Sequence, residues 1–107
     1  MTHFDVSSHH EDGVLVVVPE GELDIATVPA VRTELDARAS GEGLVIDLRK
    51  LTFLDTSGIQ LVVEAFRAAR DQGFRLRLLR ARAQVHRVFE IAGLDGVLPF
   101  EDGLAGA

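Results

Sequence analysis

The stretch LTFLDTSGIQLVVEAF, residues 51–66, decides the fold, because it joins an apolar run to an amphipathic segment through the polar cluster Asp55-Thr56-Ser57-Gly58. Apolar residues then recur at helical spacing, which predicts a helix over residues 57–73 that ends at Gly73. Ser57 and Gln60 have the S-x-x-Q spacing of a capping box, so the Ser57 hydroxyl is expected to cap this helix. The same hydroxyl is also a candidate functional group, since loops after parallel strands gather binding sites.

A helical wheel divides the predicted helix into three stripes. The core-facing stripe holds Ile59, Val62, Val63 and Phe66, and the polar stripe holds Gln60, Glu64, Arg67 and Asp71. Leu61, Ala65 and Ala68 lie between them, on the flank that Ser57 leads into. This flank is a candidate docking face for a partner, and the alternative is that it packs against a neighbouring helix.

The rest of the chain alternates strand-like and helix-like segments. Strands are expected around Phe4 and Val6 and over residues 13–23, 43–48 and 74–80, with helices over 27–41 and 82–93 and a short last strand within 96–100. Pro19 should mark a strand end or a bulge, Thr27 should cap its helix, and the tail 101–107 should fray. This order predicts one domain over residues 1–107, an α/β fold with a small mixed, mostly parallel sheet of four to five strands and an antiparallel opening pair.

Composition excludes several functional classes. The chain has 107 residues and no cysteine, which rules out disulfide scaffolds, thiolate metal sites and cysteine nucleophiles. No apolar run approaches the ~20 residues of a membrane span, and the N-terminus does not read as a signal peptide, so we expect a cytoplasmic protein. The net charge is −6, and residues 1–48 carry ten acidic and two basic side chains. This balance argues against nucleic acid or a membrane as the main partner and fits a protein partner with a basic patch.

Two acidic segments are candidate sites in their own right. Residues 21–24, GELD, place two acids at the end of the second predicted strand, where they form either a turn or a metal or acid–base pair. Residues 9–12, HHED, could ligate a metal, but a contiguous polar run before Gly13 is more typical of a solvated hairpin turn. Neither pattern supplies a third ligand at a defined spacing, so we predict no metal and no cofactor.

Two further patterns have conventional explanations. His86 falls on the outward face of the last helix and is expected at the surface; with Ser57 and an Asp it would make a hydrolase triad, but Ser57 is not in a G-x-S-x-G motif. A basic stripe of Arg75, Arg77, Arg80 and Arg82 lacks interleaved Tyr or Trp, which favours a solvated sheet edge over a nucleic-acid site. The chain is therefore not expected to be an enzyme.

Three segments together resemble a known family. GELD at a strand end, VIDLRKLTFLDTSGIQLV in mid-chain and VFEIAGLDGVLPF near the end are similar, in this order, to the STAS-domain family, above all to the free-standing anti-sigma factor antagonists. The D-[ST]-S-G segment after a hydrophobic strand is the most specific part of the resemblance. It implies a small mixed sheet with helices packed largely on one side.

The resemblance also implies a function. In that family the unphosphorylated antagonist binds an anti-sigma factor, which is also a serine kinase, and so releases a sigma factor. Phosphorylation of the second hydroxyl of the motif, here Ser57, prevents binding, and a serine phosphatase resets the protein. The implied partner-binding residues are Asp24, Asp55, Thr56, Ser57 and Gly58, to which the helical wheel adds Leu61.

Other roles stay open within the family. Thr56 stands where some members have Ser, and a Thr at this position also occurs in the wider family, including stress-signalling scaffold proteins. STAS domains also serve as modules of sulfate transporters or as subunits of lipid-transport complexes. The chain is expected to be a monomer or weak dimer.

The start of the predicted helix suits either reading of Ser57. Its unpaired N–H groups and positive dipole end accept a capping hydroxyl or a phosphate. A phosphoserine carries about −1.5 to −2 charges at pH 7, which a folded helix start tolerates and a buried interface does not. Gly58, without a side chain, would allow the nucleotide of a kinase to approach closely.

Overall fold

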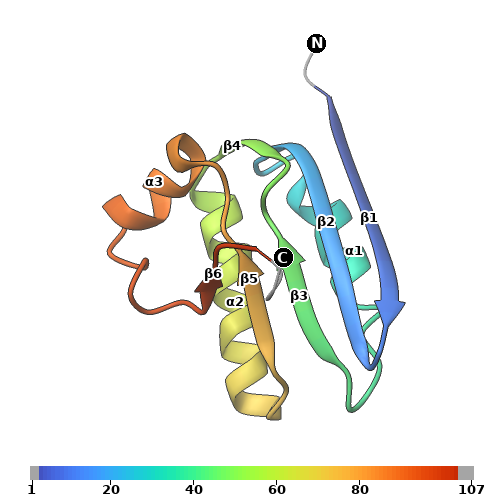
Figure 1. Cartoon of the computed structure of the whole chain (residues 1–107). Coiled ribbons are helices and arrows are strands. Elements are labelled where there is room, and N and C mark those ends of the chain that lie inside the picture. The colour runs from blue at the N-terminus through green and yellow to red at the C-terminus, as the bar shows by residue number, and fades with distance from the viewer. Residues whose placement is uncertain (1–2, 104–107) are drawn as a thin grey trace.

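Alternating apolar residues build one mixed sheet whose buried face carries the helices. The computed structural model describes residues 3–103, and Figure 1 shows α1 and α2 behind the sheet with α3 at its side. In chain order the elements are β1 (Phe4–Glu11), β2 (Val14–Leu23), α1 (Val28–Leu35), β3 (Gly43–Asp47), β4 (Leu51–Leu54), α2 (Thr56–Gln72), β5 (Leu76–Leu79), α3 (Ala83–Ile91) and β6 (Phe100–Glu101). Within residues 3–103 every helix is too short or too polar to cross a membrane.

The sheet has the strand order β1-β2-β3-β5-β6, and β4 pairs with β2 beyond the end of β3. In the part of the chain that the structure describes, only the β1–β2 pair is antiparallel. The α/β fold and the mostly parallel sheet are thus confirmed, but the described residues form six strands rather than four to five. The pattern missed β4 because its two central residues, Thr52 and Phe53, are both exposed, so that it neither alternates nor forms an apolar run.

The helix-facing side of β2 forms the centre of the core. Leu15, Val17 and Leu23 are almost completely buried there, as alternation in a strand requires. Pro19 does not end the strand, and the register shift of β2 falls between Gly21 and Glu22 and not at Pro19, so both expectations for this residue are wrong. β2 pairs with β3 as far as Val17 and with β4 only from Gly21 onward, so Pro19 lies between these two pairings. Its missing N–H therefore removes no hydrogen bond to either parallel neighbour.

The first strand is longer than the sequence indicated. β1 pairs with β2 over eight consecutive residues, from Phe4 opposite Gly21 to Glu11 opposite Val14. The hairpin turn is Asp12-Gly13, with φ of 50° and 79°. The HHED segment is thus mostly strand rather than turn. Its short polar residues alternate between the two faces of the sheet, a pattern that the apolar period could not detect.

The remaining differences lie at element ends. The helix predicted over 27–41 ends at Leu35, and a turn begins at Asp36. The strand predicted over 74–80 is limited to the four residues of β5. Of the expected frayed tail, Glu101 belongs to β6 and pairs with Arg77, and residues 104–107 lie outside the described residues.

Candidate functional site

The parallel strands β2 and β4 bring two polar turns together at one edge of the sheet. Leu23 and Leu54, the last residues of the two strands, are paired, and the backbone N–H of Asp55 donates to the carbonyl of Leu23 at 3.3 Å. The turn that follows Leu23 and the start of α2 are therefore neighbours. Two of the segments that the sequence singled out, GELD and DTSG, meet at this edge.

Asp24 holds the turn between β2 and α1. Its carboxylate Oδ1 accepts hydrogen bonds from the backbone N–H of Ala26 at 2.9 Å and of Thr27 at 3.1 Å. The Thr27 hydroxyl donates back to the carbonyl of Glu22 at 2.8 Å, and it does not cap α1 as predicted. Of the GELD segment, residues 21–23 are therefore the end of β2, and Asp24 begins the turn.

The cap of α2 is Asp55 and not Ser57. Asp55 has an extended backbone, and its Oδ1 accepts from the N–H of Ser57 at 2.9 Å and, more weakly, of Gly58 at 3.4 Å. The predicted capping box of Ser57 and Gln60 is therefore wrong. Asp is as good a cap as Ser, and it stands where the chain is still extended, which the spacing rule alone did not distinguish.

Ser57 is consequently not needed to cap the helix. It occupies the second position of α2, half-buried, beside the exposed Thr56. A hydroxyl in the first helical turn lies in the positive field of the helix dipole, next to the carboxylate that already satisfies the helix N–H groups. The site thus offers a partly accessible nucleophilic oxygen on a rigid element.

Gly58 serves packing and not access. It is buried, and a Cβ added there would overlap Leu54 Cδ1 and approach Leu23 Cγ within 3.1 Å. The absence of a side chain lets the first turn of α2 lie directly on the ends of β2 and β4. The expectation that Gly58 leaves room for a nucleotide is therefore wrong, because its open side faces the core.

Of the flank of α2 that was a candidate docking face, Leu61 and Ala65 are buried and Ala68 is half-buried. Leu61 is 2% exposed, and the buried residues of α2 are Gly58, Leu61, Val62, Ala65 and Ala69, whereas Ile59 and Phe66 are only half-buried. Leu61 and Ala65 line a groove of about 360 Å³ between α1 and α2. Packing against a neighbouring helix was the alternative, and it is confirmed. The wheel was misread because α2 contacts both the sheet and α1.

Two apolar side chains that the sequence reasoning missed are exposed at the same edge. Ile25 is 78% exposed in the turn after β2, and Phe53 is 46% exposed on β4, opposite Glu22. They stand on either side of the paired residues Leu23 and Leu54. Ile25 could have been found from its position, since an isoleucine directly after a turn acid has no strand or helix period to bury it.

His86 is buried instead of exposed. It is 3% exposed and packs edge-on against the ring of Phe100 at 4.5 Å between centroids. Its Nε2 lies 2.6 Å from Asp95 Oδ1 and 2.8 Å from an Arg80 nitrogen. The hydrogen bond from His86, assisted by Arg80, lowers the pKa of Asp95. Because His86 is committed to this cluster and not to Ser57, the hydrolase triad is not formed.

The same cluster also contains a group of side chains that resembles a metal site. In the part of the chain that the structure describes, His86, Glu90 and Asp95 have ligand atoms within 4.8 Å of one another, and the HHED segment forms no such group. The Arg80 guanidinium, 2.9 Å from Asp95, already supplies the positive charge at this point. Arg77 likewise pairs with Glu101 at 2.7 Å, so Arg77 and Arg80 both have structural roles. Of the predicted basic stripe, the exposed members are Arg75 and Arg82.

Comparison with known proteins agrees with this geometry. The family model of the STAS domain matches residues 5–107. The anti-sigma F factor antagonist of Paenibacillus polymyxa is 29% identical over 108 residues, which cover 98% of this chain and 92% of the relative. The anti-sigma-B factor antagonist of Listeria monocytogenes is 32% identical over 84 residues, covering 77% of this chain and 74% of its own length.

Solved structures share the fold. The crystal structure of an anti-sigma factor antagonist from Mycobacterium paratuberculosis has a TM-score of 0.83 at 28% identity, covering 95% of this chain and 88% of that chain. The Bacillus cell fate determinant SpoIIAA in its phosphorylated form has a TM-score of 0.69 at 22% identity, covering 96% and 93%. The matches define a class of small regulators that are not enzymes. The chain belongs to the STAS domain family, and its relatives there are anti-sigma factor antagonists.

Proposed function

We propose that this protein, in its unphosphorylated form, binds an anti-sigma factor that is also a serine kinase, and thereby releases a sigma factor in the cytoplasm. Phosphorylation of Ser57 by that kinase ends the binding, and a serine phosphatase restores it. The observation that carries the proposal is the position of Ser57, a partly accessible hydroxyl in the first turn of α2 that Asp55 leaves free of a capping role.

The edge of the sheet at which β2 and β4 end and α2 begins supports a partner surface. Ile25 and Phe53 supply exposed apolar groups, and interface anchors are characteristically large apolar side chains surrounded by polar ones. The partner-binding set becomes Asp24, Ile25, Phe53, Asp55, Thr56 and Ser57. Gly58 and Leu61 leave this set because both are buried. Asp24 acts by holding the turn that presents Ile25.

Electrostatics support the switch. Three acidic residues, Glu22, Asp24 and Asp55, already lie at this edge, so a kinase-type partner must present basic or hydrogen-bonding groups to it. A phosphate would add about −1.5 to −2 charges at the centre of the interface. Burying that charge without a matched partner costs several kcal/mol, and every ~1.4 kcal/mol is tenfold in affinity. A protein of the same fold exists in a phosphorylated form.

The test is incubation with the anti-sigma factor kinases of the source organism and ATP, followed by mass spectrometry. One phosphate is expected on Ser57, and calorimetric titration of the two forms should show binding at least ~30-fold weaker after phosphorylation. Ser57→Ala should remain unmodified, whereas Ser7→Ala, which alters an exposed serine on β1, should be modified like the wild type. A phosphate found on Thr56 or Ser7 would overturn the assignment.

A further inference from the structure

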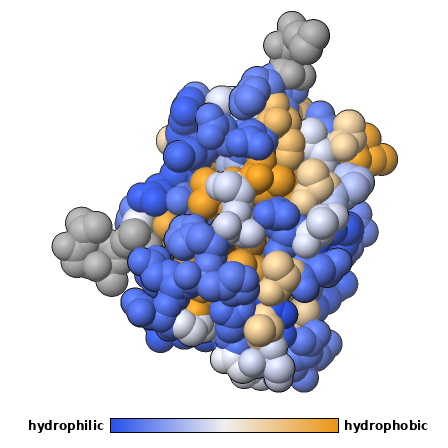
Figure 2. Space-filling view, turned by 90° about the vertical axis from the view of Figure 1, so that its right-hand side faces the viewer, coloured by the Kyte–Doolittle hydropathy of each residue, from blue (hydrophilic) through white to orange (hydrophobic). Residues whose placement is uncertain are grey.

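Among residues 3–103, no strand pairs with the outer edge of β1. β1 is the first strand of the sheet, pairs only with β2 and stands at the right-hand border in Figure 1. Figure 2 looks onto this side of the molecule, where apolar and hydrophilic groups are interspersed. Edge strands present a row of N–H and C=O groups that can pair with another chain.

The hairpin turn determines which backbone groups point outward. With positive φ at both Asp12 and Gly13, the turn is of type I′, and Glu11 and Val14 are its hydrogen-bonded flanking pair. Hydrogen-bonded and non-hydrogen-bonded pairs alternate along an antiparallel ladder. The backbone groups that point away from β2 are therefore those of Phe4, Val6, Ser8 and His10.

Several of the usual protections of an edge strand are lacking on β1, although it carries the acidic side chains Asp5 and Glu11. It contains neither Pro nor Lys, and its pairing with β2 runs over eight residues without a bulge. The side chains of Ser8 and His10 turn back onto the same molecule, where they bond Glu34 at 2.8 Å and Glu42 at 2.8 Å. They leave the outer edge itself open.

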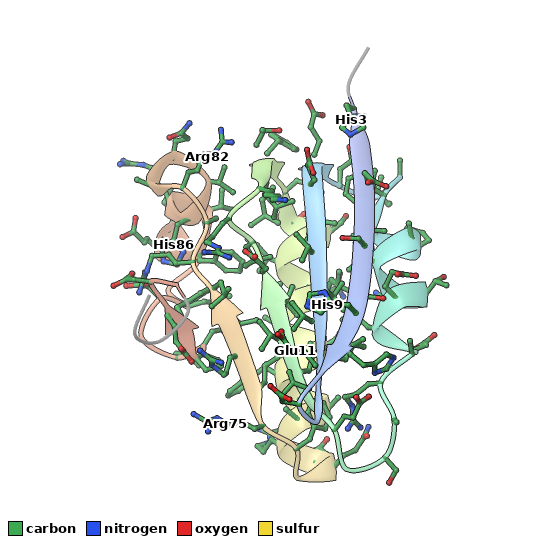
Figure 3. The ribbon with its side chains drawn as sticks, turned by 45° about the vertical axis from the view of Figure 1, so that its right-hand side comes forward. His3, His9, Glu11, Arg75, Arg82 and His86 are labelled. Atoms are coloured by element: carbon green, nitrogen blue, oxygen red, sulfur yellow. The ribbon has the colours of Figure 1, made fainter. Side chains whose placement is uncertain are left out.

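The carboxylates and imidazoles on the other face of β1 are self-complementary. Figure 3 shows His9 and Glu11 on this strand and His3 directly before it. Asp5 is separated from His9 by an even number of residues, so both side chains lie on the face of β1 turned away from the helices. If two copies of β1 pair antiparallel about a two-fold axis at Ser7, Asp5 lies opposite His9 and His3 opposite Glu11, twice each. Opposite residues then share a face, as a continuous sheet requires.

The neighbouring registers are worse. Shifting the axis by one residue in either direction keeps the faces matched. One shift, however, places the carboxylate of Asp5 opposite that of Glu11, and the other places His3 opposite His9 and leaves Asp5 without a histidine opposite. Like charges directly opposite each other destabilise a strand pair. The charge pattern therefore selects both the occupant and the register.

We propose that β1 pairs antiparallel with β1 of a second copy of this chain, about a two-fold axis at Ser7, to form a dimer with one continuous sheet. The outward groups of Phe4 and Val6 meet those of His10 and Ser8 of the other copy, which supplies main-chain hydrogen bonds from both strands. The interface is small, so the dimer is weak and reversible. It does not rest on the proposed function, because Ser57 and Asp55 lie off this edge.

Analytical ultracentrifugation from about 5 µM to 1 mM tests the dimer. The wild type should pass from monomer to dimer within this range. His9→Asp, which puts two carboxylates opposite each other at two places, should weaken dimerisation at least ~tenfold. The double variant Asp5→His, His9→Asp exchanges the two groups and should restore it. Gln84→Glu adds the same charge on the exposed start of α3 and should leave dimerisation unchanged.

A backbone variant tests the strand pairing itself. Ser8→Pro removes an N–H that points outward and leaves the hydrogen bonds to β2 in place, so the variant should fold, as judged by circular dichroism, and stay monomeric. If it does not fold, the charge exchange decides. A wild type that is monomeric at 1 mM, a His9→Asp variant with unchanged association, or a double variant without recovery would each overturn the proposal.

Discussion

At the scale of single residues, capping and signalling are divided between two neighbours. Asp55 accepts hydrogen bonds from the backbone N–H groups of Ser57 and Gly58, and Ser57 is a half-buried residue in the first turn of α2. A hydroxyl that also capped the helix would couple every phosphorylation to helix stability. With Asp55 as the cap, a phosphate on Ser57 meets the helix dipole and an adjacent carboxylate, which act in opposite directions.

This division predicts unequal costs of mutation. Asp55→Ala should lower the free energy of unfolding by about 0.5–2 kcal/mol, because two helix N–H groups lose their acceptor, whereas Asp55→Asn should cost a few tenths at most, since Asn is an equally good cap. Ser57→Ala should stay within about 0.5 kcal/mol of the wild type, as a surface substitution away from a cap does. Urea unfolding measures all three, and a Ser57→Ala variant as unstable as Asp55→Ala would contradict the assignment of the cap.

At the scale of elements, the site is positioned by the close approach of α2 to the ends of β2 and β4. The contact depends on Gly58, whose missing side chain leaves room for Leu54 and Leu23. α1 is positioned by Asp24 from the same edge. The two helices that carry the site are therefore fixed at their first turns, where the partner is expected to bind.

Filling the space at Gly58 should loosen this contact. Gly58→Ala should lower stability by about 1–3 kcal/mol, the usual cost of overpacking, which exceeds the gain of up to about 1 kcal/mol from the better helix propensity of Ala. Gly96→Ala is the matched control, because a Cβ there meets no atom within 4 Å, and it should be nearly neutral. Thermal and urea melts compare the two; a Gly58→Ala variant more stable than the wild type would show that Leu54 moves aside freely.

These elements also show how far sequence patterns reach. The buried strands and the amphipathic helices follow from local periodicity, which is why the α/β fold class was predicted correctly. Leu61 was misplaced because a wheel cannot say that a second helix covers its flank, and His86 was misplaced because its burial depends on Phe100, far along the chain. β4 was missed because it is held as a strand by its pairing with β2, and its own residues show no strand pattern.

At the scale of the whole molecule, ion pairs join elements that are distant in the sequence. Arg32 and Glu64 connect α1 with α2, Arg77 and Glu101 connect β5 with β6, and Arg80 ties β5 to Asp95. Hydrogen bonds from these guanidinium groups lower the pKa of Glu64 and Glu101, and for Asp95 the His86 ring contributes first. At Glu42 the backbone N–H of Ala39 has the same effect, followed by His10.

Asp47 is the most deeply buried member of this group. Burial by itself opposes ionisation, but the side chain and backbone N–H of Arg49 donate to the carboxylate at 2.8–3.0 Å and outweigh it, so the pKa lies below its ordinary value. A carboxyl group with a lowered pKa in the folded state binds fewer protons than in the unfolded chain. Its contribution to stability is thus fully present above the unfolded value, about 3.9 for Asp and 4.3 for Glu, and is lost as the pH falls through the lower folded value.

The protein should therefore be acid-labile in a defined window. Urea midpoints should change little between pH 7 and about 5.5 on account of these carboxylates and should fall steadily below that as protons bind the unfolded chain. Asp47→Asn should lower the midpoint at pH 7, because Arg49 loses its ionised partner, yet the gap between the two curves should narrow as the pH falls below about 4, where protons begin to bind the unfolded wild-type carboxyl. A gap between wild type and variant that stays constant from pH 7 to pH 3 would mean that Asp47 stabilises the fold by its shape and not by its charge.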